Sequence, residues 1–294
     1  MELQGIQVNR SIIDLPPDVS EEIIQKTQES SIVMQLAEET EMPGRGKEIP
    51  VITSDPEAAW VGETARKPVS RPGLSKKILT PYKLAVIVPF SDEFKRDAKT
   101  LYDAIVKRLP RALAQKFDAT CFGNVAAPGN NFDTFANCTA QGIGGTKTYA
   151  GLVAADTDIA VHGGILNGYA ISPQGKGILL TATDGNDRPL FINNVSEGSV
   201  PVILGAKTLL SKAAYKAGTP NIIGVAGDWT QAMYGTVEGV KISIADQATL
   251  VEGEGEDQEI FNLFQHNMFA VRAEIELGFR ADTSCFNLLT DDAN

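Results

Sequence analysis

The sequence predicts an α+β fold, and three stretches of it carry that prediction. Residues 269–280 alternate apolar and mostly polar side chains with period two, which indicates a long strand with one buried face. Residues 92–123 repeat apolar side chains at three- and four-residue steps, which indicates the longest helix of the protein. Residues 148–240 break into short segments separated by turn residues. We therefore expect a mixed α/β domain inserted into the domain that holds the long helix and strand.

The first half of the chain contains several further predicted elements. Ser20 can cap a helix whose first turn carries two glutamates. Residues 49–53 indicate a short strand, and the β-branched run 84–88 predicts a buried strand that Pro89 closes. Pro110 predicts a kink or a fresh start within the long helix, because proline removes a backbone hydrogen bond.

The second half is expected to consist of shorter elements. Residues 124–147 are rich in Gly, Asn, Ala and Thr and predict a loop. A short helix or turn is expected after residues 170–173, and strands are expected at 200–204 and 222–225. The acidic, glycine-spaced residues 252–259 predict a solvated turn before the long strand.

Composition places the chain among ordinary globular proteins and limits its functions. Of its 294 residues, 43% are hydrophobic and 21% are charged, which excludes a disordered composition. A formal net charge of −11 argues against general nucleic-acid binding, although it permits a protein that encloses nucleic acid without gripping it. Three cysteines without CxxC spacing predict reduced, packed thiols made in a cytoplasm. The chain shows neither a signal-peptide layout nor an apolar run near the ~20 residues of a membrane span.

One basic stretch reverses the sign of this acidic chain. Residues 64–83 carry six cationic side chains and no acid, and their prolines and glycine prevent a helix. Residues 18–41 hold seven acids against a single lysine. A basic segment without a core of its own predicts a projecting arm, and the acidic segment is its apparent partner. Together they predict that the basic arm of one copy of the protein binds the acidic segment of another copy.

The expected contacts between copies involve charged residues of these two segments and one tryptophan. Trp60 lies in a polar arm, and because an exposed indole is costly unless covered, we expect it to dock on a neighbouring subunit. Packing against its own strand is the alternative. The predicted contact residues are Trp60, Arg66, Lys67, Arg71, Lys76 and Lys77 in the arm and Glu21, Glu22, Glu38 and Glu39 in the acidic segment.

Several motifs approach a catalytic or binding pattern without completing it. Residues 162–164, His-Gly-Gly, resemble an oxyanion-hole turn, but no G-x-S-x-G sequence accompanies them, so a loop histidine is expected. Asp156, Asp158 and that histidine fit no metal-ligand spacing and are expected to be solvated loop residues. Residues 142–147 and 175–177 each miss the phosphate-loop pattern beside their lysine. The sequence therefore predicts no catalytic residue, no cofactor and no metal.

Five segments follow one another in a specific order along nearly the whole chain, from about residue 15 to residue 290. They are AAWVGETARKPVSRPGLSKKILTPYKLAVIVPFSDEFKRDA (58–98), ISPQGKGILLTATDGNDRPLF (171–191), PVILGAKTLL (201–210), GDWTQAMYGTVEGVKISI (227–244) and LFQHNMFAVRAEIELGFRADTSCFNLLT (263–290). In this order they resemble the extended loop with its strand and spine helix, the axial domain and the last peripheral-domain strands of tailed-phage major capsid proteins of the Hong Kong 97 type.

The resemblance implies a Hong Kong 97-type capsid fold with peripheral and axial domains, an extended β-hairpin loop and an N-terminal arm. The basic arm corresponds to the extended loop that overlies a neighbouring subunit, and the acidic segment to the arm that crosses a subunit boundary. The implied divisions are 1–41 for the N-terminal arm with its helix, 42–83 for the extended loop, 84–125 for the peripheral domain with the spine helix, 126–239 for the axial domain and 240–294 for the return strands of the peripheral domain.

The resemblance also implies a function. It is that of a structural major capsid protein, not an enzyme, which self-assembles through pentamers and hexamers into an icosahedral shell enclosing a phage double-stranded DNA genome. It implies a place in the virion capsid after assembly in the host cytoplasm, a portal protein as partner, and DNA enclosed without sequence-specific binding, with no membrane and no cofactor. An encapsulin-like shell around protein cargo is the alternative. A soluble α/β hydrolase is the weaker one, because its nucleophile–base set is missing.

The sequence departs from the family pattern in two respects. Many relatives carry an extra N-terminal domain that serves as a built-in scaffold and is later cleaved. Here the capsid-like pattern begins almost at Met1, so we expect a separate scaffolding protein. Some relatives join subunits through a Lys–Asn isopeptide bond. Lys67, Lys76 and Lys77 lie in the corresponding loop, but no matching Asn or catalytic Glu is identified, so this cross-link is not expected.

Overall fold

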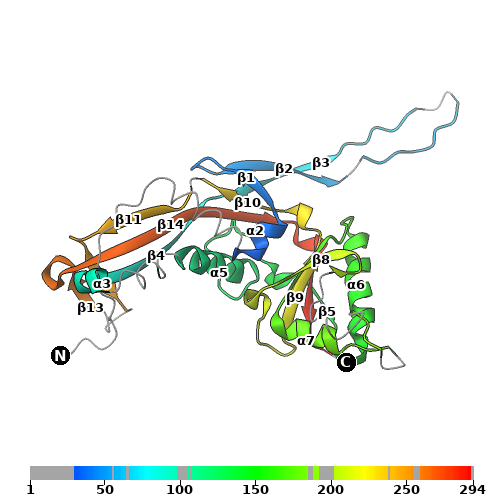
Figure 1. Ribbon diagram of the computed structural model, residues 1–294. Helices are drawn as coiled ribbons and strands as arrows, with labels where there is room; N and C mark the ends of the chain where they lie inside the picture. Colours follow the sequence, from blue (N-terminus) through cyan, green and yellow to red (C-terminus); the bar gives the residue numbers. More distant parts are fainter. Residues whose placement is uncertain are drawn as a thin grey trace.

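The computed structural model describes residues 30–54, 56–63, 66–97, 105, 108–184, 188–191, 202–237, 239–253 and 259–292. The helix expected from Ser20 lies outside these residues. The described chain forms two larger sheets with helices packed against them and two separate hairpins (Figure 1). Helices and strands are thus mixed in the way that the α+β prediction requires.

The first sheet is built around one long strand, β14 (Met268–Ala281). β10 (Ala232–Thr236) and β11 (Lys241–Ala245) pair with it antiparallel on one side, and β4 (Tyr82–Ser91) pairs antiparallel on the other. β1 (Glu38–Glu41) extends the sheet by pairing parallel with β10. Strands from the beginning, middle and end of the chain therefore meet in one sheet.

The period-two pattern of β14 is confirmed. Its apolar side chains are all buried, and these are Phe269, Val271, Ala273, Ile275, Leu277 and Phe279. On the opposite face Arg272 is exposed, whereas Glu274 and Glu276 are half-buried. A period of two places alternate residues on opposite sheet faces, and burial of one face fixes the register.

The prediction for the strand beginning at Leu84 is wrong in two respects. Pro89 does not close the strand but lies inside β4, opposite Ala270 of β14. Within the described residues β4 pairs only with β14, so it is an edge strand, where a proline without an N–H group costs no ladder hydrogen bond. The run 84–88 is also not fully buried, because its burial alternates and Ile87 remains 48% exposed.

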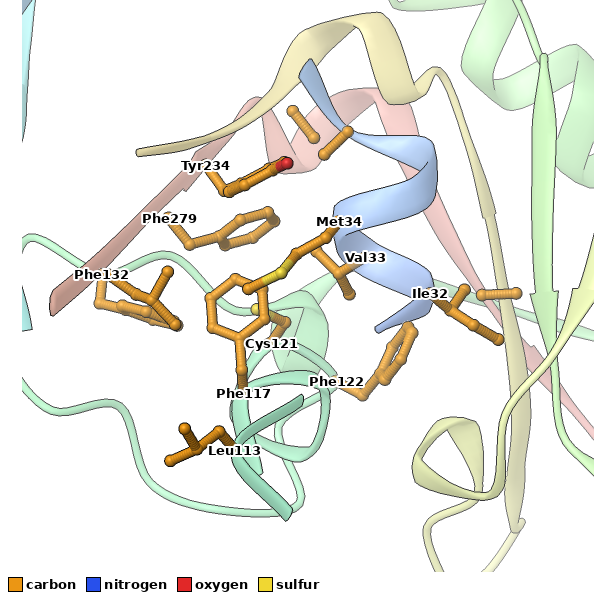
Figure 2. Close-up of a cluster of buried hydrophobic side chains, with 14 of the residues drawn as sticks. Ile32, Val33, Met34, Leu113, Phe117, Cys121, Phe122, Phe132, Tyr234 and Phe279 are labelled. Carbon is orange, nitrogen blue, oxygen red and sulfur yellow. The ribbon is translucent and has the colours of Figure 1, made fainter. Parts of the chain in front are cut away.

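Helices cover one face of the first sheet. α5 (Leu109–Cys121) has Pro110 in its first turn, which confirms a fresh helix start there, since the N–H groups of the first turn have no partner within the helix. α3 (Asp92–Asp97) precedes it, and most residues between the two helices lie outside the described part. α2 (Ile32–Leu36) packs beside α5, and Figure 2 shows their side chains converging on Phe279 of β14.

The core of this layer is aromatic. Phe117 of α5 meets Phe279 and Phe132 edge-on, with ring centroids 6.2 Å apart in each case. Edge-to-face contacts of this kind add to the free energy of burial. The same cluster includes Cys121, and all three cysteines are free and buried, which confirms packed thiols. Burial raises the pKa of the Cys138 thiol to about 12.

The second sheet has six strands and its own hydrophobic cluster. In spatial order the strands are β5 (Thr139–Gly142), β15 (Phe286–Thr290), β9 (Ile222–Gly227), β6 (Gly168–Ile171), β8 (Ala206–Leu210) and β7 (Val202–Ile203). Two helices pack against it, α6 (Thr148–Val161) and α7 (Pro173–Thr181). Figure 1 shows these elements beside the first sheet, at the end opposite α3 and β13. β15 belongs to this sheet, although it falls in the range 240–294 expected to return to the peripheral domain.

Several predictions for this region are confirmed and one is wrong. Ser172 caps α7 by accepting a hydrogen bond from the Gly175 amide, and β9 includes the strand predicted at 222–225. Of the strand predicted at 200–204, only Val202 and Ile203 form a described strand, β7. The loop expected over 124–147 is interrupted by β5. None of the four residues of β5 is buried, so its sequence has no apolar alternation that would have indicated a strand.

Two hairpins and six short 3-10 helices complete the described fold. β2 (Lys47–Ser54) pairs with β3 (Gly73–Leu79), and β12 (Thr249–Glu252) pairs with β13 (Glu259–Asn262). Most of the turn predicted at 252–259 lies outside the described residues. The 3-10 helices are η1 (Phe135–Asn137), η2 (Gly145–Lys147), η3 (Lys212–Ala214), η4 (Trp229–Gln231), η6 (Phe264–His266) and η7 (Thr283–Cys285). No described helix combines the length and apolar character needed to cross a membrane.

Candidate functional site: the extended hairpin and its root

The basic arm forms an antiparallel hairpin that extends beyond the rest of the molecule (Figure 1). Lys76 of β3 lies opposite Pro50 of β2, and its ammonium group lies 2.6 Å from a carboxylate oxygen of Glu48. Farther out, the Glu57 amide donates a 2.8 Å hydrogen bond to the Ser70 hydroxyl. Cross-strand contacts therefore hold the arm together, because the rest of the subunit does not cover it.

The outer part of the hairpin presents apolar and cationic side chains to water. Trp60 is fully exposed, so the alternative in which it packs against its own strand is not what the structure has. Arg66, Lys67 and Arg71 are exposed and form no ion pair among the described residues. We call this set of four residues the hairpin tip. An indole and three cations in open solvent are typical of a surface that another molecule covers.

The root of the hairpin is buried, in contrast to its tip. Leu79, the last residue of β3, has no exposed surface. It lies over Gly235 and Gly278, which face each other across the β10–β14 ladder. A Cβ atom on Gly235 would lie 2.8 Å from Leu79 Cδ2, and one on Gly278 would lie 2.7 Å from the Thr80 carbonyl oxygen. The two glycines thus make the space that admits the hairpin root.

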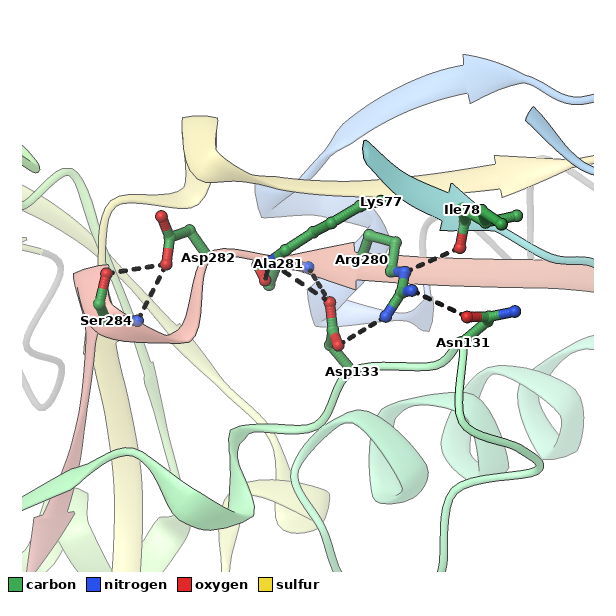
Figure 3. A network of polar contacts seen from close by, with 8 residues as sticks. All are labelled: Lys77, Ile78, Asn131, Asp133, Arg280, Ala281, Asp282 and Ser284. Carbon is green, nitrogen blue, oxygen red and sulfur yellow. Dashed lines mark hydrogen bonds and ion pairs between the residues drawn. The ribbon is translucent and has the colours of Figure 1, made fainter. Parts of the chain in front are cut away.

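A polar network next to these glycines also holds the root (Figure 3). The Arg280 guanidinium of β14 donates to the Ile78 carbonyl at 2.9 Å, to Asp133 at 2.8 Å and to Asn131 at 3.1 Å. Its side chain is only 12% exposed. Since planar guanidinium groups fix the directions of their donors, Arg280 links β3, β14 and the 131–133 loop in one geometry.

Lys77 is the second cation of this network. Its ammonium group donates to the Ala281 carbonyl at 2.8 Å and lies 3.9 Å from Asp133 Oδ2, which also accepts the Ala281 amide at 3.1 Å. Asp133 therefore contacts one cation from β3 and one from β14. A cavity of about 410 Å³ lies next to this network, between Pro50 of β2 and Met233 of β10.

The predicted contact residues therefore occupy different environments. Lys76 and Lys77 are engaged inside their own subunit, the first with Glu48 and the second at the root. Glu38 and Glu39 lie exposed on β1. Glu21 and Glu22 lie outside the described residues. The members that remain open to water and without an ion pair in the described part of the arm are Trp60, Arg66, Lys67 and Arg71.

The N-terminal segment is anchored by a buried carboxylate. Asp118 of α5 accepts the Ser31 hydroxyl at 2.5 Å and the amides of Ile32 and Val33 at 3.0 and 3.4 Å. These are the first amides of α2, which have no partner within the helix. Burial raises the pKa of Asp118 to about 6, and the three hydrogen bonds oppose that rise. The start of the described chain is thus held on α5 by the hydrogen bonds of a single side chain, Asp118.

Sequence reasoning missed the residues of the root. The alternation of β14 placed Arg280 on the polar face but could not reveal that it meets β3. Asp133 lies in a segment expected to be a plain loop, and only the proximity of distant segments makes it a partner. Among the described residues, no group of three or more His, Cys, Asp or Glu side chains is placed to hold a metal ion. His162 follows the end of α6, where its Nδ1 lies 2.8 Å from the Asp158 carbonyl oxygen.

Comparisons with known proteins identify the family. Residues 14–283 match the family model described as the phage capsid family. The "Probable major capsid protein gp17" of Mycobacterium phage D29 is 29% identical over 291 residues, which cover 94% of this chain and 90% of the relative. The "Major capsid protein" of Staphylococcus phage 80alpha is 25% identical over 275 residues, or 90% of this chain and 81% of that protein.

A solved structure extends the match to the fold. It comes from Microbacterium phage Oxtober96, has a TM-score of 0.74 at 19% identity, and covers 99% of this chain and 97% of that one. The curated relatives are capsid proteins by name, neither encapsulins nor hydrolases. Because the family model spans most of the sequence, the chain belongs to the phage capsid family, as a non-enzymatic structural component of the phage head shell.

Proposed function

We propose that this chain assembles through pentamers and hexamers into an icosahedral shell that encloses double-stranded DNA, and that the hairpin tip docks on a neighbouring subunit. The observation that carries the docking proposal is the contrast between a fixed root and an uncovered tip. Leu79 is fully buried while Trp60 is fully exposed on the same hairpin. A hairpin positioned by its own subunit but left without cover is suited to bind a second copy.

Burial of exposed apolar side chains, one in the hairpin tip and two elsewhere on the hairpin, supplies a driving force for assembly. Trp60, Val69 and Leu74 are each at least 75% exposed. Covering a large apolar side chain contributes about 1.5–3 kcal/mol, so these three residues together stabilise each contact by several kcal/mol. Arg66, Lys67 and Arg71 add attraction toward an acidic partner surface, which sets orientation more than affinity. Exposed glutamates on β1 are the corresponding acidic candidates on the neighbour.

The two larger sheets support the proposed division into domains. We assign the first sheet with α3 and α5 to the peripheral domain, because among the described residues its strands pair only with one another and both helices pack on them. The second sheet with α6 and α7 becomes the axial domain, and its strand β15 (Phe286–Thr290) joins it although it follows the peripheral strand β14. The extended loop is then the β2–β3 hairpin, and the N-terminal arm ends at α2.

A scaffolding protein and a portal protein complete the proposed assembly. One kind of subunit must fit both five-fold and six-fold environments, so an additional component is needed to select the curvature of the shell. The portal protein then occupies one vertex for entry of DNA. Expression of this chain alone tests the scaffold: mixed sizes, tubes or loose capsomers support it, whereas uniform closed shells would contradict it.

The docking proposal is tested by reversing the charge of the tip. Arg66→Glu, Lys67→Glu and Arg71→Glu together are expected to leave the melting temperature within about 2 °C, because exposed charges contribute little to folding. Assembly, followed by sedimentation and electron microscopy, is expected to fail or to become far more sensitive to salt. The matched control is Arg66→Lys, Lys67→Arg and Arg71→Lys, which keeps the charges and is expected to assemble. Normal shells from the reversed variant would overturn the docking role.

A further inference from the structure

A second group of cations lies on the solvent-exposed face of α5, the face turned away from the first sheet. Arg108, at its N-cap, and Arg111 and Lys116 within it are exposed. At a rise of 1.5 Å per residue they span about 12 Å along the helix. Lys212 of η3 is exposed next to this helix, because η3 packs against α5. We call these four residues the helix-face patch.

The patch is held rigidly by its surroundings. The Asn124 side-chain amide, just beyond the end of α5, donates to the Ala213 carbonyl at 2.6 Å and to the Tyr215 carbonyl at 3.0 Å. Lys216 reaches back and donates to the Gly123 carbonyl at 2.9 Å. These bonds fix η3 to the C-terminal end of the helix, so cations from two distant segments keep a constant arrangement.

No acid in the described part of the chain pairs with the patch. None of its four cations forms an ion pair among the described residues. The one acid of α5, Asp118, is buried and accepts hydrogen bonds from Ser31 and the start of α2. The opposite face of the first sheet behaves differently, since Lys83 lies 3.1 Å from Glu276 and Arg272 lies 3.4 Å from Glu274.

The patch and the hairpin serve different sides of the subunit. Figure 1 shows α5 on one side of the first sheet and the β2–β3 hairpin on the other. A hairpin used for contacts between copies therefore leaves the α5 side for another partner. In a chain with a net charge of −11, a cationic helix face without an acidic partner among the described residues favours a polyanionic ligand.

We propose that the helix-face patch contacts the sugar-phosphate backbone of the enclosed double-stranded nucleic acid, so that the α5 side of the subunit is the inner face of the shell. This inference rests on the proposed shell function and adds its orientation. Duplex DNA carries one charge per about 1.7 Å of its axis, so a 12 Å row of cations always finds phosphates regardless of sequence. A few cations on an acidic chain bind weakly and reversibly, which lets the nucleic acid move along the wall.

The test measures binding of the full chain to a 30-base-pair duplex by fluorescence anisotropy over a series of salt concentrations. Each phosphate contact contributes about 0.9 to the slope of log K against log salt. The variant Arg108→Gln, Arg111→Gln, Lys116→Gln is expected to reduce the magnitude of that slope by about 2–3. The matched control is Lys83→Gln, Arg272→Gln, Lys241→Gln, which removes three cations of the opposite sheet face and is expected to leave the slope unchanged. Equal melting temperatures establish that both variants fold.

Three results would overturn the inference. The first is wild-type protein that does not bind the duplex in low salt. The second is an equal loss of slope in both variants, which would reflect total charge and not a particular face. The third is a helix-face variant with the wild-type slope that fails to assemble with scaffold, which would assign the patch to an acidic protein partner. Electron microscopy of wild-type shells tests the proposed function separately, so either proposal can fail alone.

Discussion

Two antiparallel strand pairs in this molecule have similar ladders and opposite surroundings. β4 and β14 pair over ten residues, and one face of that pair packs on the aromatic core. β2 and β3 pair over seven residues, and beyond the root both faces of their hairpin are in solvent. Backbone hydrogen bonds are alike in the two pairs, so burial is what separates a stable sheet from an arm. An isolated hairpin is only marginally stable in water.

The root joins the solvent-exposed hairpin to the buried first sheet. Leu79 and the network of Arg280 connect the hairpin to the first sheet, and they supply the order that the hairpin cannot generate itself. The comparison therefore makes graded predictions, from the core of the sheet through the root to the exposed hairpin.

The largest effect is expected for a carboxylate placed on the apolar face of β14. Ile275→Asp buries an unpaired charge and is expected to cost several kcal/mol, enough to unfold a domain of ordinary stability. Leu74→Asp makes the same kind of change in the hairpin, where the residue is 75% exposed, and is expected to cost ~0.5 kcal/mol or less. Thermal melts compare them, with Glu274→Lys on the polar face of β14 as a further control. Equal melting temperatures for Ile275→Asp and Leu74→Asp would refute the comparison.

The next effect is expected at the root. Leu79→Ala leaves a cavity over the paired glycines and is expected to lower the free energy of unfolding by about 2–4 kcal/mol. Ile78→Ala, on the neighbouring and 42% exposed residue, is expected to cost less than about 1 kcal/mol. Urea unfolding measures both. A smaller loss for Leu79 than for Ile78 would mean that the root is not anchored by burial.

The buried carboxylate of the N-terminal anchor predicts that the free energy of unfolding depends on pH. A raised pKa in the folded state means that the folded chain holds a proton which the unfolded chain has already lost. The stability contributed by that proton is complete below about pH 4 and is lost as pH rises through about 6. Relative to Asp118→Asn, the wild type is expected to lose about 2 kcal/mol between pH 4 and pH 7. Parallel curves for the two proteins in urea unfolding would contradict this.

The smallest effects are expected for polar contacts. Arg280→Lys keeps the charge but loses the planar arrangement of donors, and is expected to cost about 1–2 kcal/mol. Lys76→Met breaks the exposed pair with Glu48 and is expected to leave the melting temperature almost unchanged, because ion pairs in open solvent contribute little to folding. Calorimetry of both variants tests the ranking. If Lys76→Met proved the more costly, the hairpin would be held by its own cross-strand pairs and not by the root.

The sequence allowed some of these features to be predicted and not others. Local chemistry decided the alternation of β14, the helix start at Pro110 and the projection of a basic arm, so these were accessible. α6 was not, because its apolar residues do not gather on one face. β1 is a run of mostly acidic residues that becomes a strand only through pairing with β10, and Pro89 is tolerated only because β4 is an edge. Such features depend on which distant segments meet.

The late position of β14 has a consequence for biosynthesis. β4, β10 and β11 all pair with this strand, so the first sheet stays open until residue 281 has been made. The pairing of β6 with β8 and β9 needs nothing beyond residue 227 and can form on the nascent chain. The hairpin is synthesised early, yet Arg280 of its root follows Ile78 by 202 residues, so the root is completed much later. A chain that stops before β14 therefore cannot aim its hairpin at a neighbour, and polymerisation is restricted to subunits in which residue 281 has been synthesised.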